Sequence, residues 1–326
     1  MNAMEVKISE IQWQMESITL SIKQGQKVIR QRSAQSVEAG NGMKEFLRLI
    51  DEVQADVYAL GVDDELLLRR IHNLRQGALT DTFKMAVIGD FRSEKRTLID
   101  VLLGQEILST YTASTFPVIK EIKYGQKPKA VLYFVNPLPE KMYYGIPKIL
   151  AHMRRFQMKD VPPMEIPVDE IKDYMELSTG GETHRTNPFE KLELFLPSTF
   201  LKNGWELIDT IELSESLTNE VRSIECLSKA DAAVFVFNAM AMGSAVEMAY
   251  IKDTLTLYGL TGERLFCVVN CYDQLGEREQ QKVKEFSDNL LAPYTKHIYY
   301  SSAYKGLMGH LQNNEVLLQE SMIPII

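Results

Sequence analysis

The chain has 326 residues and a formal net charge of −8, from 36 Lys and Arg against 44 Asp and Glu. Hydrophobic residues make up 45% and charged residues 25%, a balance that fits a folded protein and excludes a disordered or fibrous one. The acidic balance, without a long basic run, argues against nucleic acid as a partner. No apolar run reaches the roughly 20 residues of a membrane-spanning helix, and residues 1–9 lack an apolar signal core, so we expect a cytoplasmic protein.

The first 80 residues are predicted to be helical. Apolar side chains recur there at helical spacing in three stripes, one of which runs through Ile50, Val53 and Val57. Breaks are expected near residues 36–42 and 61–64. Consecutive amphipathic helices bury their apolar faces against one another or against a helix of a partner.

From residue 82 onward, short strand-like runs alternate with helical patterns. The strand-like runs are 83–88, 118–124, 130–134, 192–196, 205–208, 232–238, 265–269 and 298–300. The helical patterns are 98–103, 219–228, 245–258 and 278–291. Such alternation predicts an α/β sheet with helices on both faces. Residues 137–187 are rich in proline and are expected to form a surface insertion rather than sheet core.

Gly89 begins a segment with the form of a phosphate-binding loop, because the segment follows a strand and opens a helix. Such a loop holds anionic oxygens with backbone N–H groups, while its lysine contacts the phosphates and its hydroxyl binds Mg²⁺. Gly89 and Lys95 have the required spacing. Glu94, however, stands where glycine is usual, and Arg96 stands where the metal-binding hydroxyl is usual. Taken alone, this match is no better than chance.

Four further segments occur in the order in which a GTPase carries its nucleotide-binding motifs. Residues 208–213 follow a strand where a GTPase has Asp-Thr-Pro-Gly, and residues 268–275 follow another where it has Asn-Lys-x-Asp. Residues 301–303 match the Ser-Ala loop that touches the base, and residues 112–117 lie in the place of the switch threonine. The shared order gives weight to the incomplete phosphate loop.

With these motifs in order, the sequence resembles the dynamin-like GTPases, and particularly the bacterial ones. The resemblance covers residues 82–319. It includes the phosphate loop with its helix, residues 121–125 as the strand beside the first switch, and residues 230–236 as the fourth strand. The fold that it implies is a P-loop GTPase-type mostly parallel sheet with helices on both faces, preceded by an N-terminal helical segment.

The resemblance implies roles for five residues at the phosphate end of the site. Gly89, Lys95 and Thr97 would lie in the phosphate loop and its helix, with Lys95 as the phosphate lysine. Asp209 would reach Mg²⁺ through a water molecule. Together with Thr115, the candidate switch threonine, Asp209 would form the catalytic set.

At the base end, the resemblance implies that Asn270 and Asp273 contact guanine, with Asp273 accepting from the ring N1–H and the exocyclic amine. Ser302 and Ala303 would border the base. Cys271 stands in the place of the base-stacking lysine, which some bacterial dynamin-like proteins also lack. The implied cofactor is therefore GTP or GDP.

Four departures from the family pattern fall on chemical positions of the phosphate end. Arg96 removes a metal ligand and puts a cation where Mg²⁺ would sit, which argues against a bound Mg²⁺. Glu94 adds a carboxylate, and one like-charge contact at about 4 Å costs roughly 4 kcal/mol at an effective dielectric near 20. Ile211 and Glu212 replace the Pro-Gly that lets a switch backbone approach the γ-phosphate.

These replacements predict a pseudo-GTPase that binds nucleotide weakly or does not hydrolyse it, and that acts through protein partners. The alternative is an active GTP-hydrolysing dynamin-like enzyme of membrane remodelling, in which the Arg96 guanidinium replaces the metal electrostatically. A third interpretation treats Lys95 and Asp209 as ordinary surface charges. It fits less well with their positions after strands, where such folds bind ligands.

The resemblance also divides the chain into three parts. A neck-like helical segment spans residues 1–80, a dynamin-type GTPase-like domain spans 81–319, and 320–326 is the start of a truncated helical stalk. Without the stalk and its lipid-binding tip, we expect membrane contact to be at most indirect or peripheral, through a partner. The apolar stripes of the neck-like helices predict a helical protein partner or a dynamin-like homologue.

Overall fold

The structure, a computed structural model, describes residues 39–61, 67–68, 71–72, 75, 79, 82–111, 118–135, 161–176, 189–210, 213 and 226–323. The chain divides into two units, Met1–Asp81 and Thr82–Ile326. None of the helices in this described part combines the length and the apolar composition needed to cross a membrane. The three-part division at residues 80 and 319 stays a prediction.

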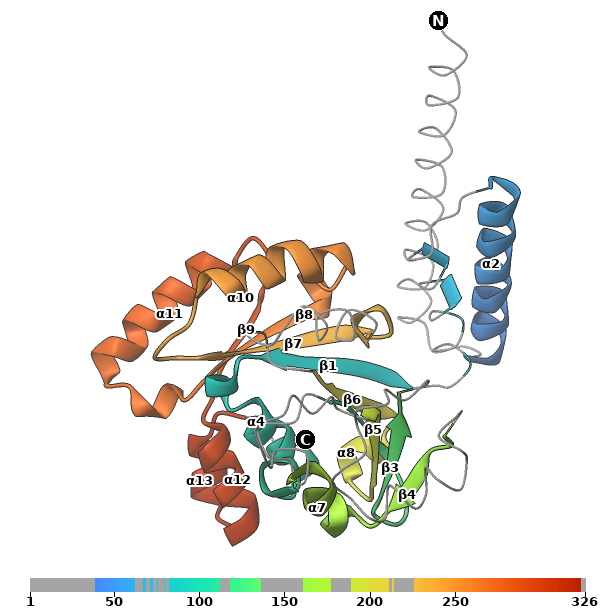
Figure 1. Cartoon of the computed structure of the whole chain (residues 1–326). Helices are drawn as coiled ribbons and strands as arrows, with labels where there is room; N and C mark the ends of the chain where they lie inside the picture. Colours follow the sequence, from blue (N-terminus) through green and yellow to red (C-terminus); the bar gives the residue numbers. More distant parts are fainter. Residues whose placement is uncertain are drawn as a thin grey trace, which may run out of the picture. The chain divides into compact units, whose positions relative to one another are not determined.

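In the first unit, the helix α2 spans Ala39–Ala59 (blue in Figure 1). It begins inside the span 36–42, where the sequence predicts a break. Its apolar stripe is buried, because Ile50 and Val57 pack in one cluster with Ile71. The helical prediction is therefore confirmed for α2, and its amphipathic pattern does bury one face.

The second unit is built on a sheet of nine strands, counted over the described residues, in the order β4-β3-β5-β2-β6-β1-β7-β8-β9. The strands are β1 (Phe83–Gly89), β2 (Ile119–Tyr124), β3 (Lys129–Phe134), β4 (Met164–Ile166), β5 (Phe189–Leu196), β6 (Trp205–Asp209), β7 (Ala232–Asn238), β8 (Leu265–Asn270) and β9 (His297–Tyr300). The pairs within β6-β1-β7-β8-β9 are parallel, as is β2 with β5. Antiparallel pairs join β2 to β6 and β3 to both β4 and β5.

Helices lie on both sides of this sheet. They are α4 (Lys95–Leu103), α5 (Leu108–Tyr111), α7 (Ile171–Glu176), α8 (Thr199–Lys202), α10 (Ala245–Ala249), the π-helical η3 (Tyr250–Leu255), α11 (Glu277–Leu291), α12 (Ala303–Gln312) and α13 (Glu315–Glu320). Short 3-10 turns are η1 (Phe91–Ser93), η2 (Val168–Glu170), η4 (Gly262–Arg264) and η5 (Tyr272–Gln274). Figure 1 shows α4, α8, α12 and α13 on one face and α10 and α11 on the other.

The central strand β7 shows why its sequence is apolar at nearly every position. Val234 and Val236 face the main core, where they share a cluster with Leu98 of α4. Phe235 faces the opposite side, where its ring centroid lies 6.4 Å from that of Tyr250. A parallel strand covered on both faces must be apolar on both, which is the pattern observed here. The predicted mostly parallel α/β fold with helices on both faces is confirmed.

One expectation for the sheet is wrong. Residues 137–187 are predicted to be a surface insertion rather than sheet core, yet β4 lies within them and pairs antiparallel with β3. Ile166 of β4 is buried in the main core. A strand of three residues is too short for an alternating pattern, and the prolines at 162, 163 and 167 around it resemble loop punctuation.

The outer half of the sheet carries a cluster of charged side chains around Glu193 of β5. Glu193 Oε1 accepts from Lys123 Nζ and from Lys191 Nζ, each at 2.8 Å, and Oε2 accepts from the Tyr133 hydroxyl at 2.9 Å. Burial alone would raise the pKa of Glu193, but the bonds from the two lysines outweigh burial and lower it to about 2. The charged form of Glu193 therefore stabilises the folded state.

We predict that Glu193→Gln lowers the free energy of unfolding by about 1–3 kcal/mol at pH 7, because it weakens two charge-assisted hydrogen bonds. The folded pKa lies below the ordinary value of 4.5, so this stabilisation is present above pH 4.5 and is lost as the pH falls through about 2. Urea unfolding at pH 7 and at lower pH should show the difference between wild type and variant shrinking with acidity.

Glu165→Gln is the matched control for this prediction. Glu165 accepts from Lys129 Nζ at 2.7 Å, but its side chain is 63% exposed. Exposed ion pairs contribute little, so this variant should change the free energy of unfolding by less than about 0.5 kcal/mol. If Glu193→Gln and Glu165→Gln change the free energy of unfolding equally, the buried cluster around Glu193 does not stabilise the fold more than an exposed ion pair does.

Candidate functional site

The carboxyl ends of four parallel strands meet at one edge of the sheet. β1 lies between β6 and β7, and β7 lies beside β8. The last residues of these strands are Gly89, Asp209, Asn238 and Asn270. In open α/β sheets, ligands bind at this edge. The structure thus brings three of the predicted site residues, Gly89, Asp209 and Asn270, to a single edge.

Gly89 has no space for a side chain. A Cβ atom added there would lie 2.6 Å from Ser93 Oγ and 2.7 Å from the carbonyl oxygen of Val236. Ser93 Oγ donates to the Asp90 carbonyl oxygen at 2.7 Å, which closes the loop on itself. Glycine at this position therefore lets the loop after β1 turn tightly over the end of β7.

Glu94 adopts the backbone conformation that favours glycine. Its φ of 55° and ψ of 37° lie in the left-handed region, which costs a non-glycine residue about 1–2 kcal/mol. Partial burial raises the pKa of its carboxyl, and the neighbouring Asp273 raises it further. The acidic replacement thus interacts with the predicted base-reading carboxylate as well as standing in the phosphate loop.

Asp209 forms a buried ion cluster with two lysines. Lys120 Nζ of β2 donates to Asp209 Oδ2 at 2.9 Å, and Lys95 Nζ lies 3.1 Å from Asp209 Oδ1. Lys95 Nζ also donates to the carbonyl oxygen of Thr210. The Asp209 side chain has no solvent exposure, and each lysine side chain is 4% exposed. Both oxygens of the carboxylate therefore face ammonium groups.

Arg96 adds a third positive charge to this cluster. Burial would raise the pKa of Asp209, but Lys120, Lys95 and Arg96 together hold it well below its usual range. Burial lowers the pKa of Lys120, and Asp209 opposes this effect while Arg96 and Lys95 add to it. The three cationic groups thus keep the buried Asp209 carboxylate in its charged form.

Asn270 ties three loops together at the sheet edge. It is fully buried. Its Nδ2 donates to the Ser93 carbonyl oxygen at 2.9 Å, and its Oδ1 accepts from Ala303 N at 2.8 Å and from Ser301 Oγ at 3.3 Å. Next to it, Asn238 Nδ2 donates to the Arg92 carbonyl oxygen at 2.7 Å. The phosphate loop is therefore held to the ends of β7 and β8 by two asparagine side chains.

The predicted base-binding residues follow β8 and β9. Asp273 lies half-buried in η5, and Ser302 is the N-cap of α12, where its Oγ accepts from Lys305 N at 3.3 Å. Cys271 is buried in the left-handed conformation, with φ of 60°. Burial raises the pKa of its thiol to about 12, helped by nearby Glu94 and Asp273. Cys271 therefore carries a protonated, weakly nucleophilic thiol near neutral pH.

Some predicted site residues cannot be placed with the others. Thr97 lies half-buried in the first turn of α4. Thr115, Ile211 and Glu212 lie outside the described residues. The roles that the sequence assigns to all the site residues stay predictions; what the structure adds is their arrangement.

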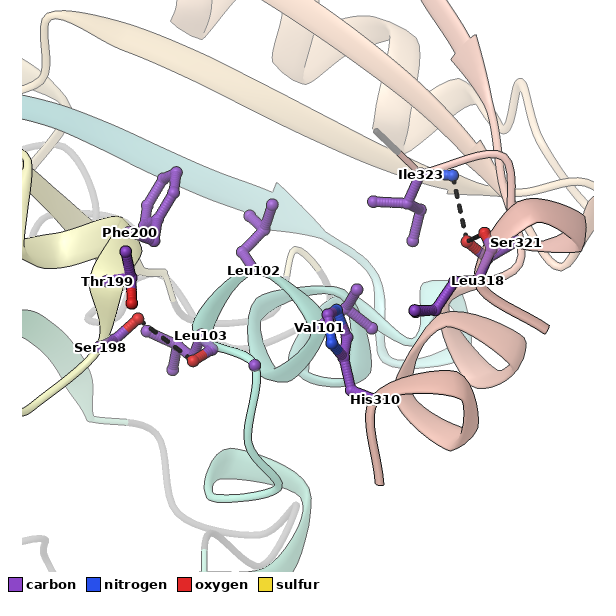
Figure 2. A pocket seen from close by; sticks show the side chains of 11 residues that line it. Val101, Leu102, Leu103, Ser198, Thr199, Phe200, His310, Leu318, Ser321 and Ile323 are labelled. Carbon is purple, nitrogen blue, oxygen red and sulfur yellow. Dashed lines mark hydrogen bonds between the residues drawn. The ribbon is translucent and has the colours of Figure 1, made fainter. Parts of the chain in front are cut away.

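A separate cavity of about 180 Å³ lies between α4, α8 and the end of the α12–α13 pair (Figure 2). Val101, Phe200, His310 and Ile323 are among its lining residues, and Figure 2 shows them reaching it from three parts of the fold. None of its lining residues is a predicted nucleotide-site residue. The cavity therefore adds nothing to the nucleotide site.

No family model matches the chain. Its sequence is 24% identical over 293 residues to an uncharacterized protein from the xynA 3′ region of Caldicellulosiruptor sp. and 23% identical over 210 residues to a bacterial dynamin-like protein of Nostoc punctiforme. Two solved structures of an oligomerised bacterial dynamin pair superpose on it with TM-scores of 0.51 and 0.54, at 17% and 16% identity. The dynamin-like GTPase fold is thereby confirmed.

The matches cover most of this chain but a smaller share of the relatives. They cover 87% of this chain and 63% of the Caldicellulosiruptor protein, and 63% of this chain and 26% of the Nostoc protein. The two solved structures cover 86% and 88% of this chain, which corresponds to 41% and 42% of theirs. The chain thus spans less than two thirds of each of these relatives.

The metal site of the dynamin-like fold does not fit Mg²⁺ in this chain. A P-loop GTPase holds Mg²⁺ with the loop hydroxyl and a carboxylate, but here Arg96 takes the place of the hydroxyl. Lys95 and Lys120 face both oxygens of Asp209, so a divalent cation beside it would meet two like charges. Over the described residues, no group of three or more His, Cys, Asp and Glu side chains is placed to hold a metal ion.

Sequence reasoning missed two residues of this site. Lys120 lies two positions from Val118 and from Ile122, which are both in the main core. A lysine on the apolar face of a strand is a signal that could have found it. Asn238 is the polar end of an otherwise buried strand, and the matching position of Asn270 on the next strand could have indicated its role.

Proposed function

We propose that this chain is a dynamin-like GTPase-type protein that binds guanine nucleotide and hydrolyses it slowly or not at all. The main support for binding is the bonding of Asn270, which links the phosphate loop through Ser93 to the predicted base-bordering loop through Ala303. One buried side chain thus connects the two loops that would contact opposite ends of a nucleotide. Asp273 follows three residues after Asn270 and would supply guanine selectivity.

Slow or absent hydrolysis is supported by the phosphate end of the site. Catalysis of phosphoryl transfer depends mostly on positioning and on charge stabilisation by the metal and its ligands. Arg96 replaces a metal ligand, and the Asp209 carboxylate is held by Lys95 and Lys120. Glu94 adds a negative charge to the loop that would surround the phosphates. An active dynamin-like enzyme remains the competing function, with Arg96 acting in place of the metal.

We further propose that the protein acts together with a helical or dynamin-like protein partner. The two solved structures with this fold are of an oligomerised bacterial dynamin pair, which is described as sensing and tethering membranes. The amphipathic α2 of the first unit supports a helical contact, because Tyr58 within it is 61% exposed and Leu60 directly after it is 38% exposed. Analytical sedimentation tests this part of the proposal. It would be contradicted if the chain sediments as a monomer both alone and in a mixture with dynamin-like proteins from the same source.

Titration calorimetry with GTP, GDP and ATP tests the nucleotide proposal. We predict that GTP and GDP bind, that ATP binds at least tenfold more weakly, and that Asp273→Ala removes this preference, because a site built to hydrogen-bond one base rejects another. Equal affinity for GTP and ATP, or no binding of either, would overturn the proposal. Steady GTP turnover that is lost in Lys95→Ala would favour the competing enzyme instead.

A further inference from the structure

The loop that carries Asp273 is held by a glutamine near the start of α11. Gln280 Nε2 donates to the carbonyl oxygen of Tyr272 at 3.1 Å and to that of Leu275 at 3.2 Å. Tyr272 is the residue before Asp273, and Leu275 lies two residues after it. One side-chain amide therefore binds the backbone on both sides of the predicted base-reading carboxylate.

Tyr272 returns a hydrogen bond to the same glutamine. Its hydroxyl donates to the main-chain carbonyl oxygen of Gln280 at 2.8 Å. Burial raises the pKa of Tyr272, and Asp288 raises it further, so the hydroxyl stays protonated near neutral pH. The Tyr272 ring is buried, with its centroid 4.8 Å from that of Tyr300 on β9. The loop therefore cannot move at Tyr272 without losing contacts to both α11 and β9.

The internal structure of this loop is weak. η5 is a 3-10 turn of three residues, and such turns have poorer hydrogen-bond geometry than an α-helix. Its turn bond, from Gln274 N to the Cys271 carbonyl oxygen, is 3.2 Å long. Cys271 has a φ of 60°, which is unfavourable for a residue other than glycine. The position of Asp273 therefore depends on bonds from outside the loop, such as the two from Gln280.

We propose that Gln280 is a positioning residue for base recognition, which holds Asp273 where it accepts hydrogen bonds from guanine. The inference rests on the proposed function, because it concerns how the same site selects its base. Gln280 acts through Asp273 rather than by touching the nucleotide, since both donor hydrogens of its amide are used within the chain. Guanine offers a ring N1–H and an amine to one carboxylate, and both bonds weaken when that carboxylate is misaligned.

The experiment compares GTP and ATP binding to the full chain and to Gln280→Met, which removes both amide donors and keeps a side chain of similar length. GTP binding should weaken by about tenfold and ATP binding should not change, because only a base that bonds to Asp273 depends on its position. A partly unfolded protein would lose binding of both nucleotides in equal proportion. The ratio of the two affinities therefore distinguishes positioning from a general structural role.

Two further proteins complete the measurement. Gln281→Met is the matched control, because the Gln281 amide donates to the exposed Glu285 on the same helix, and both affinities should stay unchanged. In an Asp273→Ala background, Gln280→Met should change GTP affinity by less than about twofold, since the carboxylate through which it acts is gone. A further tenfold loss in that background would show that Gln280 acts by another route, and the inference would be wrong.

The outcomes separate this inference from the proposed function. If the wild type binds GTP and ATP equally, or binds neither, both are wrong. If the wild type prefers GTP and a folded Gln280→Met protein keeps that preference in full, the inference alone is wrong. Should Gln280→Met fail to fold, Tyr272→Phe decides, because it removes the returning bond and keeps the ring. It should lower the preference for GTP about threefold, and an unchanged preference would overturn the inference.

Discussion

Asp209→Asn is expected to lower the free energy of unfolding by about 3–5 kcal/mol near neutral pH, the range found when one partner of a buried ion pair is removed. Asparagine has nearly the same shape as aspartate, so the change isolates the charge. In the wild type, the carboxylate faces Lys120 Nζ at 2.9 Å and Lys95 Nζ at 3.1 Å, in a position with no solvent exposure. Without it, the two buried ammonium groups lose the carboxylate that both of them contact.

The pH dependence of the Asp209→Asn variant gives a second measurement. In the wild type, burial already lowers the pKa of Lys120, and Asp209 opposes that effect. The variant removes the opposition, so the folded state binds a proton at Lys120 less readily than the unfolded state. Stability must then rise with pH wherever the unfolded state holds more protons. The variant should therefore regain stability as the pH rises toward about 10, near the ordinary pKa of lysine.

Asp273→Asn is the matched control, because it makes the same chemical change at a half-buried turn residue. Its effect on the free energy of unfolding should stay within about 0.5 kcal/mol. Thermal and urea unfolding of both variants decide the prediction. An Asp209→Asn protein within about 1 kcal/mol of the wild type would show that Lys95 and Lys120 are solvated or neutral in the folded state, contrary to the cluster described here.

The strands of the sheet could be predicted from the sequence because burial on both faces leaves a local signal. The run 232–238 is β7 itself, and the run 265–269 differs from β8 by one residue. The three-residue β4 could not be predicted, since its pairing with β3 depends on contacts rather than on its own pattern.

In the candidate site, the positions of several residues could be predicted from the sequence, but the ion pairing between them could not. The order of motifs indicated the positions of Lys95, Asp209 and Asn270, and the structure brings these residues to one edge of the sheet. The pairing of Asp209 with Lys120 was not predictable, because it joins residues 89 positions apart through the register of β2 and β6. A local pattern contains no information about such a register.

Asn270→Ala is expected to lower the free energy of unfolding by about 3 kcal/mol, because it leaves buried polar groups without partners. Asn270 is fully buried, and its amide accounts for bonds to the Ser93 carbonyl, Ala303 N and Ser301 Oγ. These bonds join the loops after β1, β8 and β9. The variant should therefore also lose nucleotide binding, and its loops should exchange amide hydrogens faster than the strands.

Asn238→Ala is the comparison variant, because it removes a hydrogen bond to the same loop from an asparagine that is less buried than Asn270. Asn238 lies opposite Asn270 in the sheet and also donates to a phosphate-loop carbonyl, that of Arg92, at 2.7 Å. Its side chain is half-buried, so water can replace the lost partner, and the loss should stay near or below about 1 kcal/mol. Urea unfolding of the two variants measures the difference. If the two variants lose similar amounts of unfolding free energy, burial of Asn270 at the end of β8 does not strengthen its hydrogen bonds between the loops. The loops would then be held mainly by their own turns.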